Sequence, residues 1–333
     1  MLELVVKKPL EIEIRNVELV QISHNDEVKI QVNYGGICGS DLSFLKGKFA
    51  HAVYPLRPGH ELVGTIIESG ESSKYKIGTR VVVLPNTFCD ECEMCKQGRT
   101  NICRNKKSLG INMDGGFAEE FVISSKFVLP IPDDLADEKA VLIEPFAVVV
   151  SAFKKVEITK GTSVAIIGGG TIGMLAASLA YRLGAQVTVI DINPKKHEIV
   201  RRIGEIRAVY PEELTNETFD IVVEAAGVKA SVEQGIQLMK PGGAMVVIGL
   251  APEANIPFIQ VVRNDQTIFG SIIYSFPDDY LQTIAYLRDP DLNVEPIVSM
   301  VLPFIEYKQA YENALTGNFG KIILKFENTQ RKY

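Results

Sequence analysis

The chain has 333 residues, about twice the length of a typical domain, which predicts two domains that can each bury a core. With 46% hydrophobic and 23% charged residues, its composition is that of a globular protein. A formal net charge of -6 without a basic stripe argues against nucleic acid and anionic membranes as partners, because few cations are available to displace their counterions.

One segment has the hydropathy of a membrane span but not its pattern. No charged residue occurs in residues 161–181, yet three glycines at 168–170 interrupt the segment, with β-branched residues before them and Leu, Met and Ala after them. This order is typical of a strand, a turn and a helix. The start, MLELVVKKPLEIEI, alternates like a strand and has no signal-peptide pattern. We therefore expect a soluble protein without a membrane partner, in a reducing compartment such as the cytoplasm.

The first 130 residues predict an all-β domain with glycine-rich corners. The alternation in LELVV, IEIRNVELV and VKIQVNY predicts antiparallel strands within residues 1–33. Further short strands are expected at LVGTIIES, at GTRVVVL, and within residues 117–123 and 127–130. Many short strands with such corners favour a β-barrel over a layered fold.

Four of the five cysteines lie within fifteen positions, at Cys89, Cys92, Cys95 and Cys103. The two-residue gaps let successive sulfurs turn toward one centre, and four thiolates closed to solvent are typical of structural zinc. An iron-sulfur cluster is the main alternative, although its usual run closes on CxxxCP, whereas Arg104 follows Cys103 here. Disulfides would need an oxidising compartment, which the start of the chain does not favour.

A second set of metal-ligand types follows glycine-rich turns or opens a helix: Cys38, His60, Glu61 and Glu144. Each residue alone has an ordinary explanation, such as a buried thiol or a glutamate in a first helical turn. Together, a thiolate, an imidazole and a carboxylate would leave a fourth position open, as in catalytic zinc. Because the cysteine cluster uses the other thiols, the third ligand is expected to be a glutamate. The remaining histidines, His24, His51 and His197, are given no functional role.

After Asp133 the pattern changes to helix, and Glu144-Pro145 opens an apolar helix expected to link two domains. From Ser163 the pattern is βαβ, with strands at SVAIIG, QVTVI, IRAVY, DIVVEAA, AMVVIG and TIFGSII. This repetition predicts a doubly wound Rossmann sheet of six parallel strands. Lys240-Pro241-Gly242-Gly243 is expected to end the helix before the fifth strand.

Residues 168–173, GGGTIG, satisfy GxGxxG between a predicted strand and a predicted helix. Gly168 would form the tight turn, Gly170 would let a pyrophosphate approach the backbone at the helix N-terminus, and Gly173 would let helix and strand pack closely. The further candidate cofactor contacts are Thr171, Ile172, Asp191, Lys196, Ala226, Ile248, Gly249 and Leu250.

Asp191 follows the second strand of this unit, where a carboxylate binds the adenosine ribose hydroxyls and repels a 2′-phosphate. This predicts NAD over NADP, although Lys195 and Lys196 are cations that could accept a phosphate. The ordinary alternative is that Asp191 caps the helix of PKKHEIV.

Beyond Phe276 we expect a helix at 278–287, a strand at 297–302, a helix at 306–315 and a strand at 321–326. This stretch is expected to return to the first domain, and the polar tail from Glu327 to fray. The predicted domains are thus 1–149 with 275–333, and 150–274.

In this order, GGICGSD, GHE, the CxxCxxC loop, the EP-initiated helix and GGGTIG resemble the medium-chain, zinc-dependent alcohol dehydrogenases over nearly the whole chain. The resemblance implies a GroES-like catalytic domain around a Rossmann domain, one catalytic and one structural zinc, and an active site between the domains. It also implies a homodimer or homotetramer.

The resemblance also assigns roles residue by residue. Cys38 and His60 match the catalytic zinc ligands, while Glu61 and Glu144 match two acids that bind zinc directly or through water. Asp41 matches a carboxylate that orients His60, and Ser40 matches the hydroxyl that begins the proton relay. Asp41 is followed by Leu42 and Ser43, so the relay histidine of many members is missing.

Glu144, where simple-alcohol enzymes have cysteine, resembles the polyol and threonine dehydrogenases, and LKGKFAHAVYPLRPGHE is similar to sugar-alcohol and sugar-alcohol-phosphate dehydrogenases. The expected function is therefore hydride transfer between NAD and a secondary alcohol of a small polyol or polyol phosphate. Threonine or another small alcohol is the alternative substrate. A non-catalytic NAD-binding protein is the alternative from another class.

Overall fold

The computed structural model describes residues 1–49 and 52–327, and these divide into two compact units. The first unit comprises Met1–Glu144, Met300–Gly317 and the segment from Lys321 onward, and the second comprises Pro145–Ser299 and Asn318–Gly320. Residues 275–299, which the sequence analysis assigned to the first domain, group with the second unit by their contacts. Domain bounds of 1–149 with 275–333 and of 150–274 stay a prediction. His51 and most of the polar tail lie outside the described residues.

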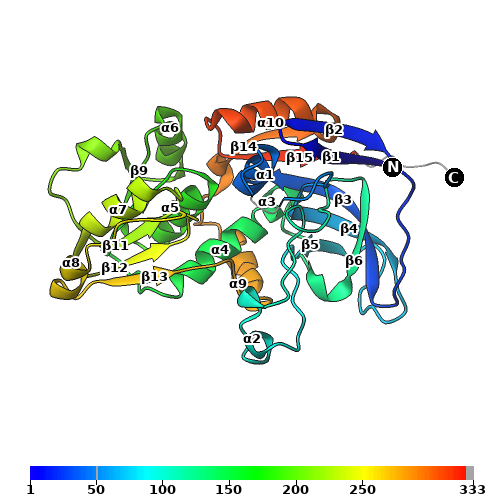
Figure 1. Ribbon diagram of the computed structural model, residues 1–333, viewed down its shortest axis with the longest axis horizontal. Helices are drawn as coiled ribbons and strands as arrows, with labels where there is room; N and C mark the ends of the chain where they lie inside the picture. Colours follow the sequence, from blue (N-terminus) through cyan, green and yellow to red (C-terminus); the bar gives the residue numbers. More distant parts are fainter. Residues whose placement is uncertain (50–51, 328–333) are drawn as a thin grey trace. The chain divides into compact units, whose positions relative to one another are not determined.

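The first unit is built on a mixed sheet of seven strands (Figure 1). Its path runs β14-β15-β3-β4-β5-β7, and β6 also pairs with β3. A separate two-stranded sheet joins β1 to β2. The strands are β1 (Leu2–Lys8), β2 (Glu11–Asn16), β3 (Glu27–Ile37), β4 (Glu61–Ser69), β5 (Arg80–Val83), β6 (Glu120–Ser124), β7 (Val128–Pro130), β14 (Val298–Pro303) and β15 (Lys321–Lys325). The long strand β3 is central because its alternating apolar residues Val28, Ile30 and Val32 are fully buried.

The expectation that the first 130 residues are all-β is wrong at two helices, α1 (Gly39–Leu45) and α2 (Glu93–Lys96). Helix α1 is short and begins in a glycine-rich run, so the sequence resembles a turn. It forms because Asp41 accepts a hydrogen bond from the Cys38 backbone N–H at 2.9 Å, and because Phe44 and Leu45 are buried. The missed helix carries Ser40 and Asp41, two of the candidate site residues.

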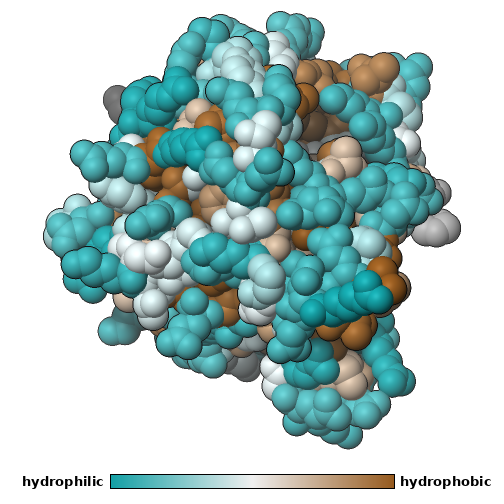
Figure 2. Space-filling view, turned by 90° about the vertical axis from the view of Figure 1, so that its left-hand side faces the viewer, coloured by the Kyte–Doolittle hydropathy of each residue, from teal (hydrophilic) through white to brown (hydrophobic). Residues whose placement is uncertain are grey.

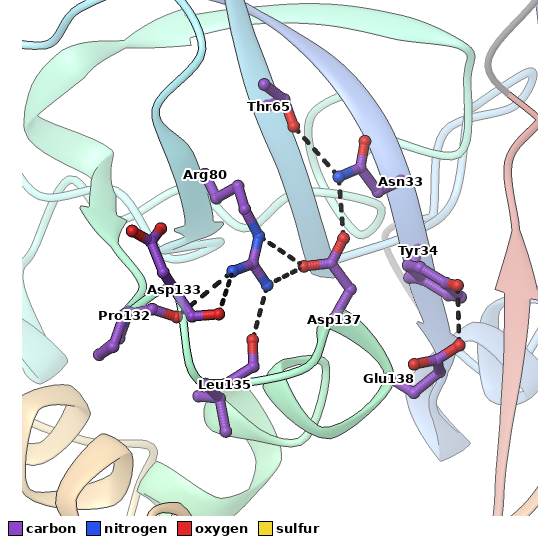
Figure 3. A network of polar contacts seen from close by, with 9 residues as sticks. All are labelled: Asn33, Tyr34, Thr65, Arg80, Pro132, Asp133, Leu135, Asp137 and Glu138. Carbon is purple, nitrogen blue, oxygen red and sulfur yellow. Dashed lines mark hydrogen bonds and ion pairs between the residues drawn. The ribbon is translucent and has the colours of Figure 1, made fainter.

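A polar network fastens residues 132–138 to the sheet of the first unit (Figure 3). The Arg80 guanidinium donates to Asp137 and, at 2.6 Å, to the Leu135 carbonyl. Asn33 on β3 donates to the other Asp137 oxygen at 2.9 Å, and the Tyr34 hydroxyl donates to Glu138 at 2.7 Å. These bonds anchor helix α3 (Asp137–Ala140) on strands β3 and β5, shortly before the chain reaches the candidate ligand Glu144.

The second unit contains six parallel strands in the order β10-β9-β8-β11-β12-β13, as the βαβ pattern predicts. The strands are β8 (Ser163–Ile167), β9 (Gln186–Ile190), β10 (Arg207–Val209), β11 (Phe219–Glu224), β12 (Met239–Val247) and β13 (Thr267–Gly270). The helices are α4 (Ile143–Phe153), which begins in the first unit, α5 (Thr171–Arg182), α6 (Pro194–Ile203), α7 (Lys229–Gln237), α8 (Phe258–Arg263) and α9 (Asp278–Leu287). Helices α5 and α6 pack against each other, and α7 packs on β11 and β12.

Residues 240–243 do not act as the expected helix stop. Helix α7 already ends at Gln237, and these four residues lie within β12, where the pairing with β11 shifts between Met239 and Ala244. The Lys240 ammonium instead bonds Asp220 on β11 at 2.8 Å. The Pro-Gly-Gly sequence is therefore accommodated as an irregularity of a strand.

The chain returns to the first unit through β14, helix α10 (Tyr307–Thr316) and β15. Strand β15 pairs antiparallel with β3, so that Ile322 lies opposite Ile37, directly beside Cys38. This pairing brings the C-terminal strand to the candidate metal site.

The surface in Figure 2 is mostly hydrophilic, with separate apolar patches. Among the described residues, no helix combines the length and the apolar character needed to cross a bilayer. Helix α5, which begins within the uncharged segment 161–181, has only 12 residues, too few to cross a bilayer.

Candidate active site

Cys38, His60 and Glu61 converge in the first unit. Each offers a ligand atom, and these three atoms lie within 4.8 Å of one another. Cys38 is the N-cap of α1, while His60 and Glu61 stand where the chain enters β4 beside β3. A soft thiolate, an imidazole and a carboxylate form a donor set that suits zinc.

Asp41 holds the loop of this site together. Its carboxylate is almost fully buried and accepts hydrogen bonds from the Cys38 N–H at 2.9 Å and the Gly59 N–H at 3.3 Å. Its Oδ1 also lies 3.4 Å from His60 Nδ1, although the angle does not make this contact a hydrogen bond. Asp41 thus lies at the Nδ1 side of the ring, which leaves Nε2 to face a metal.

The field at His60 favours positive charge. Burial lowers the pKa of the imidazole, but the charges of Asp41 and Cys38 outweigh it and raise the pKa above the usual value. Surroundings that stabilise a cation in spite of burial fit a divalent metal at this position. Ser40 Oγ lies 3.3 Å from His60 Nε2 and therefore beside the expected metal position.

Glu61 and Glu144 occupy different positions. Glu61 belongs to the converging donor set and is fully buried. Glu144, at the first turn of α4, is also buried but does not belong to this group. Its charge nevertheless acts on the ammonium of Lys321, the same group that binds Glu61. Both acids thus contribute negative charge near the donor set.

The four cysteines of residues 89–103 form a second converging group, with ligand atoms within 4.8 Å of one another. The Sγ atoms of Cys92 and Cys103 lie 3.9 Å apart, and those of Cys103 and Cys89 lie 3.6 Å apart. A tetrahedral zinc with Zn–S bonds of about 2.3 Å places its sulfurs about 3.8 Å apart. These distances fit one tetrahedral ion, and they are far too long for disulfides.

The loop acts differently on its thiols: desolvation and the neighbouring thiols raise the pKa of Cys95 to about 12, whereas the pKa of Cys92 is lowered. Backbone N–H groups of Arg104 and Cys95 point at Cys92 and lower the pKa of its thiol to about 6. A thiol of this pKa is largely ionised at neutral pH, as a metal ligand must be. The expected structural zinc therefore fits the residues present.

The glycine turn after β8 has the geometry of a dinucleotide-binding loop. Gly168 has φ +102°, which a side chain would strain, and a Cβ at Gly173 would lie 1.8 Å from the Gly168 carbonyl oxygen. Gly170 is the N-cap of α5, and a Cβ there would meet no atom within 4 Å. The N-terminus of α5, with Thr171 and Ile172 in its first turn, therefore has open space beside its N-cap, as the approach of a pyrophosphate requires.

Asp191 accepts hydrogen bonds from the Gly169 N–H at 2.6 Å and from the Asn193 N–H at 2.7 Å. It is not the cap of the following helix, because Asn193 takes that role by accepting from the Lys195 N–H at 2.9 Å. The helix-cap explanation of Asp191 is therefore wrong. The remaining lone pairs of the Asp191 carboxylate can accept hydrogen bonds from ribose hydroxyls.

A hollow of about 220 Å³ lies beside Gly168 and Asp191 in the second unit. Its walls include side chains that the sequence analysis did not propose, namely Ile192, Pro211, Val228 and Gln234. Ile192 and Val228 are apolar yet exposed, as expected of residues that pack on an adenine ring. The signal was their position, directly after Asp191 and just beyond the end of β11. Of the other proposed contacts, Ala226 lines the hollow, whereas Ile248, Gly249 and Leu250 follow β12.

Hydride transfer from an alcohol needs an acceptor for the hydride and a group that stabilises the alkoxide, and a dinucleotide fold with an open metal donor set supplies both. Fold and site thus define a metal-dependent dehydrogenase. Residues 24–133 match the family described as alcohol dehydrogenase GroES-like domain, and residues 171–288 match zinc-binding dehydrogenase. The chain belongs to the medium-chain, zinc-dependent alcohol dehydrogenase family, which acts on CH–OH groups.

Two relatives align with this chain over nearly the whole length of both proteins. Sorbitol dehydrogenase of Bacillus subtilis (strain 168) is 32% identical over 325 residues, with 92% of this chain and 91% of the relative covered. L-threonine 3-dehydrogenase of Chromobacterium violaceum is 30% identical, with 94% of this chain and 96% of the relative covered. The relatives therefore agree on the family and differ in substrate.

Solved structures give the same fold. Galactitol-1-phosphate dehydrogenase from Escherichia coli has a TM-score of 0.90 and 28% identity, covering 98% of this chain and 100% of its own. A protein from Sinorhizobium meliloti 1021 bound to NADP has a TM-score of 0.90 and 27% identity, covering 97% and 98%. An alcohol dehydrogenase from Escherichia coli CFT073 complexed with NADH has a TM-score of 0.90 and 25% identity, covering 98% and 99%.

Proposed function

We propose that this dehydrogenase oxidises a secondary alcohol of a small polyol or polyol phosphate, with NAD as the hydride acceptor. The observation that carries the proposal is the donor set itself, in which Cys38 and His60 are joined by a carboxylate, Glu61. Support for the substrate class comes from the sorbitol and galactitol-1-phosphate relatives.

The residues of the site have different roles in the proposed reaction. Cys38, His60 and one glutamate would hold a zinc ion, and this ion would supply the Lewis acidity that makes an alcohol more acidic. Asp41 fixes Cys38 and lies beside the His60 ring, so the ligands keep their geometry. Ser40, 3.3 Å from His60 Nε2, is the hydroxyl placed to accept the alcohol proton. Because Ser43 stands where many relatives have a relay histidine, the proton then leaves by another route.

In this proposal NAD is preferred over NADP because the two lysines near Asp191, Lys195 and Lys196, already bind other groups of the chain. Lys195 Nζ bonds Glu198 at 3.0 Å, and Lys196 Nζ donates to the Phe319 carbonyl. Both ammoniums thus have partners within the chain, and Lys196 also interacts electrostatically with Asp191, so a 2′-phosphate would have to compete with these contacts and would meet the Asp191 carboxylate.

A screen of substrates tests the proposal. Polyols, polyol phosphates, threonine and simple alcohols are offered with NAD and with NADP, and formation of the reduced cofactor is followed by absorbance. The highest kcat/KM is expected for a polyol or its phosphate with NAD. A threonine dehydrogenase, favoured by the relative from Chromobacterium violaceum, would instead prefer threonine.

Replacement of Cys38 tests whether the site is catalytic. Cys38→Ser should abolish turnover and leave NAD binding, measured by titration, unchanged. Undiminished turnover in this variant would contradict the assignment. A non-catalytic NAD-binding protein would show no turnover even in the wild-type chain and would bind zinc only at the four cysteines.

The proposal includes a homo-oligomer in the cytoplasm. Helix α8 exposes Phe258, Ile259 and Val262, and the neighbouring strand β13 is an edge of its sheet. All five cysteines are free thiols, which a reducing compartment preserves. Light scattering after size-exclusion chromatography measures the mass, and a monomer would contradict this part of the proposal.

A further inference from the structure

A lysine from the far end of the chain is buried beside the metal ligands. The side chain of Lys321, the first residue of β15, is 2% exposed. Its ammonium lies 2.6 Å from Glu61 Oε1 and 2.5 Å from Glu61 Oε2. The third proton goes to the carbonyl of Ile37 at 3.1 Å, the residue before Cys38. Lys321 therefore contacts one proposed ligand and the backbone that carries another.

The pair is built into the fold. A Cβ at Gly36 would lie 2.1 Å from Glu61 Oε2 and 3.2 Å from the Lys321 side chain, so glycine is needed to leave room for them. Gly36 lies opposite Glu61 in the pairing of β3 with β4, and opposite Ile323 in the pairing of β15 with β3. Three strands thus fix the position of one buried ion pair.

Both oxygens of Glu61 are bound by Lys321, yet Glu61 is also the carboxylate of the converging donor set. A metal ion and an ammonium are both cations, so each weakens the hold of the other on the same carboxylate. Resting on the proposed function, we infer that Lys321 is a positioning residue that competes with the metal for Glu61 and keeps this ligand exchangeable. An exchangeable ligand lets the coordination of the metal adjust when the alcohol enters or leaves the open fourth position.

The inference makes a prediction opposite to that of a purely structural lysine. Without the Lys321 ammonium, Glu61 would be a buried anion without its ion-pair partner, which costs free energy. A divalent cation bound to Glu61 would offset this free-energy cost. Metal affinity should therefore rise when Lys321 is replaced by a neutral residue. A lysine that only maintains the fold would have the reverse effect, because its loss would loosen the ligands.

The test titrates cobalt(II) chloride into full-length protein whose four-cysteine site retains zinc and whose Cys38 site has been emptied by a chelator. The absorption bands of cobalt bound to Cys38 report occupancy, and Cys38→Ser gives the background. Lys321→Met should lower the cobalt dissociation constant by about tenfold or more, because removal of one partner of a buried pair is costly. The turnover number of the zinc form should fall at the same time, since a permanently bound Glu61 could no longer exchange when the alcohol binds or leaves.

Lys29→Met is a matched control. Lys29 is also a nearly buried lysine of the same sheet and pairs with Glu68 on β4 at 2.6 Å. Its replacement removes a lysine–glutamate pair from the same sheet, away from the donor set and with a more exposed glutamate, and it should leave the cobalt dissociation constant unchanged. An unchanged or weaker affinity in Lys321→Met, with a normal Lys29→Met, would overturn the inference.

Two further variants keep the inference testable if the Lys321→Met protein does not fold. Lys321→Gln removes the charge but keeps a hydrogen-bond donor for Glu61, and its affinity should change in the same direction. In Glu61→Gln/Lys321→Met both charges are absent, so the gain in affinity should disappear; a gain that persists without the carboxylate would contradict competition for Glu61. The readout is independent of substrate, so a chain that oxidises no alcohol can still confirm the inference, and an active enzyme can still refute it.

Discussion

At the scale of the residue, Asp41 shows how much a group that does not itself bind the metal can contribute. It accepts two backbone hydrogen bonds, from Cys38 and Gly59, and lies 3.4 Å from His60 Nδ1. It therefore connects Cys38 with His60, two proposed ligands from different segments of the chain. Loss of its charge should loosen both without removing either.

We expect Asp41→Asn to weaken metal binding at the Cys38 site by about 10- to 100-fold, the usual effect of losing a carboxylate that orients a ligand. Metal content after dialysis against a chelator, together with kcat/KM, measures the change. Asp114→Asn is the control, since Asp114 accepts a hydrogen bond from the Arg57 N–H at 3.0 Å but lies at the surface. Full retention of metal in Asp41→Asn would contradict this role.

Asp191 is the residue on which the predicted preference for NAD over NADP depends. In Asp191→Ser, loss of charged hydrogen bonds worth about 1.5–3 kcal/mol should raise the KM for NAD by about 10- to 100-fold, while the KM for NADP should change less. Steady-state kinetics with both cofactors measures the ratio. Glu233→Gln, which alters an exposed contact with Asn255 in the same unit, should leave both KM values unchanged. An unaltered preference in Asp191→Ser would mean that another group selects the cofactor.

At the scale of the element, one ion pair holds three parallel strands together. Asp220 on β11 accepts from the Ser163 N–H on β8 at 2.8 Å and from the Lys240 ammonium on β12 at 2.8 Å. These bonds, with Lys240 the largest cause, lower the pKa of Asp220 to about 2. The carboxylate therefore stabilises the sheet only while it is ionised.

The pH dependence follows from this lowered pKa. The stabilisation is complete above the unfolded pKa of about 3.9 and is lost as the pH falls through the folded pKa of about 2. Asp220→Asn should lower the Tm by a few degrees at neutral pH, roughly 2–4 °C per kcal/mol, and the difference should narrow below about pH 4. Because the Asp220 side chain is 42% exposed, added salt should also narrow the difference. Calorimetry against pH and salt measures both, and a difference that widens in acid would contradict the assignment.

At the scale of the whole molecule, the chain carries two metal sites with different tasks. The four-cysteine site draws all its ligands from residues 89–103, whereas the Cys38 site draws them from α1 and the start of β4. The first closes one loop, and the second leaves a position for substrate. Their effects on stability and on activity should therefore separate.

We expect two zinc ions per chain in the wild type and one in each of two variants. Cys38→Ser should lose activity with a nearly unchanged Tm, whereas Cys92→Ser should lower the Tm and expose residues 88–104 to proteolysis, because the loop loses its only metal crosslink. Elemental analysis, calorimetry and limited proteolysis measure these outcomes. One zinc ion in the wild type would contradict the two-site arrangement.

The sequence by itself determined the features that depend on neighbouring residues. The cysteine spacing, GxGxxG with Asp191, and the six βαβ strands are local patterns, because a chelating loop, a helix N-terminus and an alternating strand each form from residues close in the chain. The tertiary structure decided what depends on distant residues. Only the pairing of β15 with β3 brings Lys321 to Glu61, and the burial of Phe44 and Leu45 in the folded chain stabilises α1. Such contacts leave no periodic signal, since burial and charge compensation arise only when the strands come together.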